Sequence, residues 1–160
     1  MSNAPATNLT FAVRRLGRGD VGAFRELNRL FAEAFDDAVH YQQAPPSDAY
    51  LQALLAKPHV IALVTLVEGK MAGGLVAYVL DKFEKERSEV YIYDLAVLEQ
   101  FRRRGIARSL IVELKKIAAD IGAWVIYVQA DKNAEDFPAR QLYESMGERE
   151  DVFHYDIAID

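Results

Sequence analysis

The sequence contains no cysteine and no long uninterrupted apolar run. The lack of cysteine excludes disulfide scaffolds, thiolate zinc sites and cysteine nucleophiles. A membrane-spanning helix needs about 18 consecutive apolar residues, and no stretch approaches that length, so we expect no membrane partner. The formal charge is -5, with 19 Lys and Arg against 24 Asp and Glu. The basic excess of a general nucleic-acid binder is therefore absent, and we expect no nucleic-acid partner.

The 160 residues are 51% hydrophobic and 27% charged, which is typical of one globular domain with a sizeable core. We therefore expect a single domain over residues 1–160, with residues 1–10 flexible. Residues 1–10 are small and polar, without a basic start or an apolar segment. This pattern predicts no secretory signal, and we expect a cytoplasmic protein.

The charge is unevenly distributed. Residues 131–160 hold nine acids and three bases, a net charge of -6, so the rest of the chain sums to +1. One tight basic cluster stands out before this acidic segment: Arg102, Arg103, Arg104 and Arg108. This cluster is too small for a nucleic-acid duplex but matches the size of one phosphorylated small molecule.

Apolar periodicity predicts strands at 11–16, 60–67, 71–80, 87–97, 123–130 and 152–159. It predicts helices at 21–35, between Ser47 and Pro58, at 106–121 and at 137–146. Strands 87–97 and 123–130 are apolar on both parities and flank a helix, which implies a parallel central pair. The fold class is therefore α/β (α+β), a mixed sheet with helices on both faces.

The run Arg102-Arg103-Arg104-Gly105-Ile106-Ala107 lies where a central strand leads into a helix. The first N–H groups of a helix have no intrahelical partner and attract anions. Gly105 lets a phosphate approach the backbone, Ala107 keeps the turn open, and the guanidinium groups add charge. A diphosphate would fit here, although the arginines could also be merely solvated and Gly105 merely a turn residue.

The pattern Arg102-x-x-Gly105-x-Ala107 resembles the acyl-CoA pyrophosphate signature of the GCN5-related N-acetyltransferase superfamily. The resemblance covers Phe11 to about Ile157, because the order of elements also matches. It implies one acetyltransferase domain with a mostly antiparallel sheet and acetyl-CoA as co-substrate. The residues that it assigns to coenzyme A are Leu95, Ala96, Val97, Arg102, Arg103, Arg104, Gly105, Ile106, Ala107, Arg108 and Asp136.

A second segment, from Asp136 to Gly147, is similar to the family's Asn-x-x-Ala-x-x-Leu-Tyr-x-x-x-Gly-Phe pattern. Asp136 replaces the asparagine and Glu148 the final apolar residue, so the Asp136 contact with coenzyme A departs from the family. Tyr143 matches, and the resemblance implies that it protonates the departing thiolate, a task suited to a phenol. The alternative is a tyrosine packed between helix and sheet.

The run from Arg87 to Val97, together with Tyr127 to Asp131, looks like the aminoglycoside 3-N-acetyltransferases of this superfamily, which confer antibiotic resistance. Such substrates are polycationic amines, and an acidic cleft would attract and hold them. The candidate substrate-binding residues are Asp37, Asp48, Tyr93, Asp94, Asp131 and Glu135. Each of these acids except Asp94 could instead be an ordinary surface carboxylate.

Asp94 interrupts an apolar strand, where a carboxylate is costly unless it has a partner or faces a cleft. The resemblance places it beside the acetyl-transfer centre. Moving a proton from an ammonium to an ordinary aspartate is uphill by about 6 pKa units. We therefore expect Asp94 to orient the amine and accept its proton, directly or through water, while the backbone N–H near Val97 polarises the carbonyl. Alternatively, Asp94 could bond a neighbouring loop.

Other acceptors remain open: a polyamine or a peptide amine would also suit an acidic cleft, and a non-catalytic acyl-CoA-binding module could keep the fold. His40, His59 and His154 have no metal-ligand spacing, so we expect no metal. With no thiol to form an acetyl-enzyme, direct transfer to the amine is favoured. Family analogy and the alternating segment 152–159 suggest a homodimer.

Overall fold

A computed structural model describes residues 10–159. The expected flexibility of residues 1–10 therefore lies, except for Thr10, outside the described residues. The chain divides into two compact units, Met1–Gln129 and Ala130–Asp160, and each is described by itself. None of the helices between residues 10 and 159 is long and apolar enough to cross a membrane.

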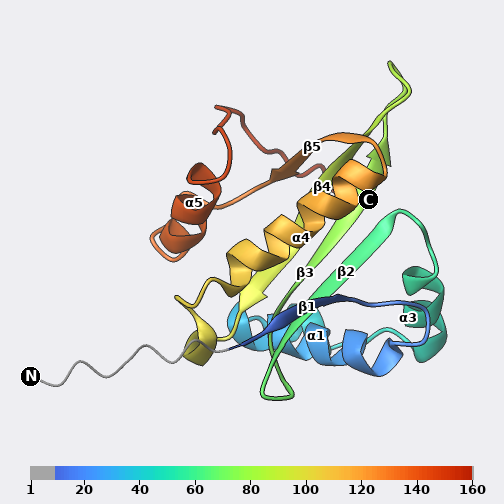
Figure 1. The fold of residues 1–160 in the computed structure, drawn as a ribbon, viewed down its shortest axis with the longest axis vertical. Coiled ribbons are helices and arrows are strands. Elements are labelled where there is room, and N and C mark those ends of the chain that lie inside the picture. The colour runs from blue at the N-terminus through green and yellow to red at the C-terminus, as the bar shows by residue number, and fades with distance from the viewer. Residues whose placement is uncertain (1–9, 160) are drawn as a thin grey trace, which may run out of the picture. The chain divides into compact units, whose positions relative to one another are not determined.

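The first unit contains a five-stranded sheet in the order β1-β2-β3-β4-β5 (Figure 1). The strands are β1 (Ala12–Arg15), β2 (Val60–Val67), β3 (Lys70–Asp81), β4 (Ser88–Val97) and β5 (Ala123–Val128). Neighbouring strands are antiparallel except β4 and β5, which are parallel. The expected mixed, mostly antiparallel sheet is confirmed, with its parallel pair at one end of the strand order.

The helices of the first unit are α1 (Val21–Ala34), α2 (Ala38–Gln42), α3 (Asp48–Leu55), the 3-10 turn η1 (Glu99–Phe101) and α4 (Ile106–Asp120). Ser47 caps α3, as expected, by accepting a hydrogen bond from the Tyr50 N–H at 3.2 Å. Two elements were not predicted, α2 and η1. Neither has a buried residue, so neither shows the apolar periodicity on which the prediction depends.

Two consecutive glycines of β3 show how the helices cover the sheet. Successive residues of a strand face opposite sides. A Cβ on Gly74 would clash with Leu27 of α1, whereas a Cβ on Gly73 would meet Ile106 of α4 at 3.2 Å. Helices α1 and α4 therefore cover opposite faces, as expected, and both approach the sheet too closely for side chains here. Figure 1 shows α4 running along β3 and β4.

The second unit contains α5 (Phe137–Glu144), close to the predicted helix 137–146. The predicted strand 152–159 is wrong, because these residues form no strand in the structure. Their apolar side chains are exposed, from 66% for Val152 to 96% for Ile159. Apolar alternation expresses a preference for extended backbone, but a strand also needs a neighbour to accept its hydrogen bonds.

Candidate functional site

A bulge in β4 determines which way Asp94 faces. Val76 pairs with Asp94 and the next residue of β3, Ala77, pairs with Ile92, so Tyr93 is an extra residue in β4. Without the bulge, Ile92 and Asp94 would share one face of the sheet. The bulge moves Asp94 to the face of Val76 and Gly74, which is covered by α1, because an inserted residue reverses the alternation.

The Asp94 carboxylate is half-buried on this face and has a specific partner. The Tyr41 hydroxyl of α2 donates a hydrogen bond of 2.7 Å to Asp94 Oδ1. Desolvation raises the pKa of the Asp94 carboxyl above its usual value, while the bond from Tyr41 and the nearby His40 act in the opposite direction. Asp94 is therefore a better proton acceptor than an exposed aspartate.

Tyrosine rings surround Asp94. The half-buried Tyr78 of β3 meets Tyr93 edge-on with ring centroids 5.8 Å apart, and Tyr93 meets Tyr91 at 5.6 Å. Tyr91 stacks on Tyr127 of β5 at 4.8 Å. Tyr93 is 60% exposed, so one ring of this group faces solvent beside the carboxylate. Aromatic faces next to a carboxylate suit an ammonium ion or a sugar ring.

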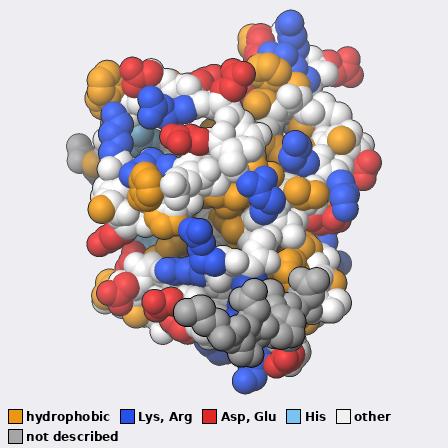
Figure 2. All heavy atoms as spheres, turned by 60° about the vertical axis from the view of Figure 1, so that its left-hand side comes forward, with side chains coloured by type: hydrophobic (Ala, Val, Ile, Leu, Met, Phe, Trp, Pro, Cys, Tyr) orange, Lys and Arg blue, Asp and Glu red, His pale blue; other side chains and the backbone are white. Residues whose placement is uncertain are grey.

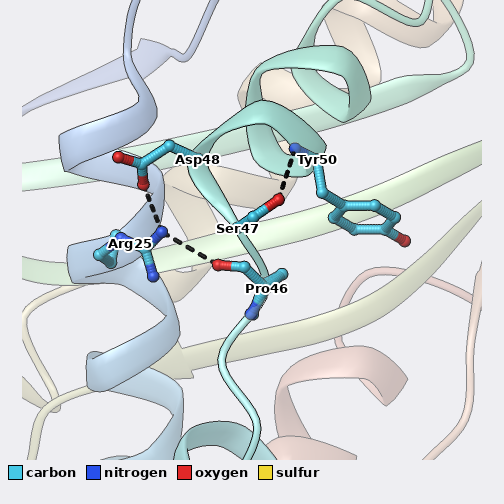
Figure 3. A network of polar contacts seen from close by, with 5 residues as sticks. All are labelled: Arg25, Pro46, Ser47, Asp48 and Tyr50. Atoms are coloured by element: carbon cyan, nitrogen blue, oxygen red, sulfur yellow. Dashed lines mark hydrogen bonds and ion pairs between the residues drawn. The ribbon is translucent and has the colours of Figure 1, made fainter.

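Helix α1 holds the segment that carries Tyr41. Asn28 of α1 donates a hydrogen bond of 2.8 Å to the Tyr41 carbonyl, and the Tyr41 ring contacts Phe31 and Phe35. Further along, Arg25 donates to the Pro46 carbonyl and forms an ion pair with Asp48 (Figure 3). The chain from α2 to the start of α3 is thus fastened to α1 at both ends.

The arginine turn has the geometry of an anion site at the start of α4. Gly105 precedes the helix with φ of +81°, and an added Cβ would meet nothing within 4 Å, so the backbone there is open. Arg103, at φ +64°, and Arg104 are exposed, and the Arg104 guanidinium lies 5.8 Å from the Phe101 ring. The turn therefore presents helix N–H groups and two exposed cations to one region.

The other residues of the expected coenzyme A site have mixed environments. Arg102 turns back, and its Nε donates a hydrogen bond of 2.9 Å to the Val97 carbonyl. Ile106 is buried, so only its backbone can face a ligand, whereas Ala107 is half-buried and Arg108 exposed. On the face drawn in Figure 2, basic side chains are interspersed with acidic and apolar ones.

Backbone N–H groups are available at the end of β4. The Leu98 N–H donates to Ala72 of β3 at 2.9 Å, so the alternate N–H groups of Leu95 and Val97 point away from β3. The ladder between β4 and β5 ends at Ile92 and Val128. Within the described residues, Leu95 and Val97 therefore face no neighbouring strand on that side, while Ala96 points its N–H toward β3.

Two acids of the first unit that we expected at the substrate have structural partners. Asp37 caps α2 by accepting a hydrogen bond of 3.0 Å from the His40 N–H. Asp48 pairs with Arg25, although its side chain is 78% exposed. Asp37 still lies within electrostatic reach of Tyr41. The described residues contain no group of three or more His, Asp or Glu side chains suited to a metal ion.

In the second unit, the expected residues lie on α5 and the loop before it. Asp136 Oδ2 accepts a hydrogen bond of 2.9 Å from the Asp131 N–H, and Arg140 donates to the Asp131 carbonyl, so this loop is closed on itself. The side chains of Asp131 and Glu135 are exposed. Desolvation, with the Asp136 carboxylate, raises the pKa of Tyr143 to about 12. Tyr143 is therefore protonated at neutral pH and able to donate.

Sequence reasoning missed Tyr41 and Tyr78 as neighbours of Asp94. Tyr41 lies 53 residues from Asp94 in a five-residue helix, and Tyr78 lies in an apolar strand where it resembles a core residue. Asp37 could have indicated the start of α2, because an aspartate before a helix caps it by accepting a hydrogen bond from the N–H three residues later, here that of His40. The bulge left no signal, because β4 is apolar on both parities.

The sequence matches a known protein family. The family model of the acetyltransferase (GNAT) family matches residues 24–147. A search of curated proteins found no match.

Among solved structures, an aminoglycoside acetyltransferase from an uncultured soil metagenomic sample is 48% identical, with a TM-score of 0.93, over 94% of this chain and 99% of that one. Another from such a sample, in complex with sisomicin, is 32% identical, with a TM-score of 0.85, over 94% and 97% of the two chains. The aminoglycoside N-acetyltransferase AAC(6')-Iy in complex with CoA is 18% identical and shares the fold, with a TM-score of 0.70 over 98% and 100%.

Proposed function

The chain belongs to the acetyltransferase (GNAT) family, and on that premise we propose that it transfers an acetyl group from acetyl-CoA to an amine of an aminoglycoside. The observation that carries the proposal is the half-buried Asp94 carboxylate, surrounded by tyrosines, in a chain 48% identical to an aminoglycoside acetyltransferase. We further propose that residues 1–160 act as one acetyltransferase domain, in the cytoplasm, where acetyl-CoA is available.

Coenzyme A has a suitable binding surface in the first unit. The open turn at Gly105 and the exposed Arg103, Arg104 and Arg108 suit a diphosphate. The N–H groups of Leu95 and Val97 both point away from β3, so that of Leu95 suits an amide carbonyl of the extended arm and that of Val97 suits the thioester carbonyl at its end. Acetyl-CoA supplies the acetyl group as a reactive thioester. Asp136, whose carboxylate is bonded within its own loop, is the weakest of the proposed contacts.

Asp94 binds and orients the reacting amine in this proposal. Proton transfer from an ammonium to an ordinary aspartate costs about 9 kcal/mol. The raised pKa of Asp94 reduces that difference, since its carboxylate is poorly solvated. Asp94 therefore accepts the proton, directly or through water, and leaves a neutral amine to attack the thioester carbonyl.

Two further groups complete the proposed mechanism. The Val97 N–H polarises the thioester oxygen, because among the described residues no neighbouring strand accepts a hydrogen bond from it. The Tyr143 phenol, held protonated by its raised pKa of about 12, donates a proton to the departing sulfur. Each group acts on a different atom of the reaction, so removing one leaves part of the rate enhancement.

The acceptor is proposed as a polycationic amino sugar. Tyr93 offers a ring face to its ammonium groups, and Asp131, Glu135 and Asp37 add negative charge. Asp48, paired with Arg25, contributes least. We propose the 3-amino group as the modified position, following the resemblance of 87–97 and 127–131, and resistance to the modified antibiotic as the outcome.

The acceptor class is tested by thiol release from acetyl-CoA with gentamicin, kanamycin, spermidine and a basic peptide, each alone. We expect release with the aminoglycosides, and NMR of the product should place the acetyl group on the 3-amino nitrogen. Asp94→Asn should lower kcat by about 10²- to 10⁴-fold, because it removes the proton acceptor, and should leave CoA binding intact. Release with spermidine alone would favour a polyamine acetyltransferase, and release with no amine would favour a binding module.

The phosphate site is tested by Gly105→Glu, with CoA binding measured by calorimetry. The variant adds a side chain at φ +81° and a negative charge where the diphosphate is proposed to bind. We expect affinity to fall about tenfold or more, through repulsion at short range. The matched control is Gly122→Glu, at φ +71° beyond the other end of α4, which should bind CoA normally. Equal affinity of the two variants would place the pyrophosphate elsewhere.

We also propose that the protein is a homodimer, in which residues 152–159 contact a second copy. Phe153, Tyr155, Ile157 and Ile159 are all at least 79% exposed, and the rings of Phe153 and Tyr155 lie 6.3 Å apart. Exposed apolar side chains grouped in one segment favour burial against a partner. Sedimentation should give a dimer for the full chain and a monomer for Ile157→Asp. A monomeric wild-type protein at micromolar concentration would contradict the proposal.

A further inference from the structure

We infer that Tyr41 is a positioning residue, which holds the Asp94 carboxylate in the orientation that receives the amine. The inference rests on the proposed function, because it gives Asp94 the task of binding the reacting amine. Tyr41 does not need to touch either substrate. It acts through the 2.7 Å hydrogen bond from its hydroxyl to Asp94 Oδ1.

A carboxylate has two oxygens and rotates about its bond to Cβ unless something fixes it. The Tyr41 hydroxyl fills one acceptor position of Oδ1 and fixes the plane of the carboxylate, while Oδ2 accepts no bond from Tyr41 and can receive the amine. The same bond stabilises the charged form of the carboxylate and so opposes the rise in pKa that burial causes. Tyr41 therefore both orients Asp94 and favours its ionised form.

Tyr41 is itself fixed on several sides, as this task requires. Asn28 bonds its carbonyl at 2.8 Å, and its ring packs against Phe31 at 6.1 Å and Phe35 at 5.9 Å between centroids. His40, with its ring centroid at 5.1 Å, covers another side. A phenol held in this way has little freedom to leave Asp94.

Other titratable groups also influence Asp94. His40 lies on α2 beside Tyr41, and its electrostatic interaction with Asp94 lowers the pKa of that carboxyl. Tyr78 from β3 and Tyr91 from β4 are both within electrostatic reach of Asp94, and burial raises the pKa of each phenol, so neither adds charge at neutral pH. Tyr93 interacts with Tyr78 and Tyr91. Among these side chains, Tyr41 is the direct partner of the carboxylate, through its hydrogen bond of 2.7 Å to Asp94 Oδ1.

The test is Tyr41→Phe, which removes the hydroxyl and keeps the ring packing. We expect kcat with an aminoglycoside to fall about tenfold and KM for acetyl-CoA to stay unchanged, because only the amine side loses its orientation. The acidic midpoint of the pH–rate profile should rise by about one to two pKa units, the value of one hydrogen bond to a charged acceptor. Tyr155→Phe removes a phenol from an exposed ring of the second unit and keeps the ring, so it is the matched control, expected to behave as wild type.

A double-mutant cycle separates positioning from a merely structural role. In the Asp94→Asn background, Tyr41→Phe should change the residual rate by less than about twofold, because its only route to the reaction is already lost. An unshifted acidic midpoint in Tyr41→Phe, or full additivity of the two changes, would overturn the inference. If Tyr41→Phe fails to fold, Asn28→Ala takes its place, with a smaller shift expected in the same direction.

The outcome for Asp94 keeps this inference distinct from the proposed function. Full turnover by Asp94→Asn would refute the role given to the carboxylate, whatever Tyr41 does. Loss of turnover in Asp94→Asn with a normal Tyr41→Phe profile would refute the positioning role alone.

Discussion

The single extra residue in β4 is the constraint on which the site depends. Tyr93 reverses the alternation of the strand, so Asp94 lies on the α1 face while Ile92 keeps to the α4 face. A carboxylate on the α4 face would lie on the same side of the sheet as the buried Ile92, at a high desolvation cost. On the α1 face the carboxylate accepts a hydrogen bond from the Tyr41 hydroxyl and lies beside the exposed ring of Tyr93.

The same face also explains why α1 carries more than core residues. Phe31 of α1 belongs to the apolar cluster that covers Val76 and Ala96, whereas Asn28 and Arg25 of the same helix fasten the chain around α2 and α3. Packing and site positioning thus share one helix. The sheet contributes Asp94, and α1 supports Tyr41. The hydrogen bond between Tyr41 and Asp94 joins two residues that lie 53 positions apart in the sequence.

Most secondary structure of the first unit was predictable because strong apolar periodicity marks α1, α4 and the strands. The need of Asp94 for a partner was also predictable, since a carboxylate in an apolar strand requires one. The partner was not, because α2 has five residues and no buried face. The bulge was not predictable, because a change of register leaves no visible mark in a strand that is apolar on both faces. The strand predicted at 152–159 was wrong, because apolar alternation alone does not provide a neighbouring strand.

The most direct test of this account is the titration of the Asp94 carboxyl carbon by NMR in the free wild-type protein, assigned by its loss in Asp94→Asn. The account predicts a pKa above the usual aspartate value of about 4, because burial outweighs the bond from Tyr41. A carboxyl that titrates at or below that value would contradict it, since Asp94 would then lack the raised basicity that the mechanism requires.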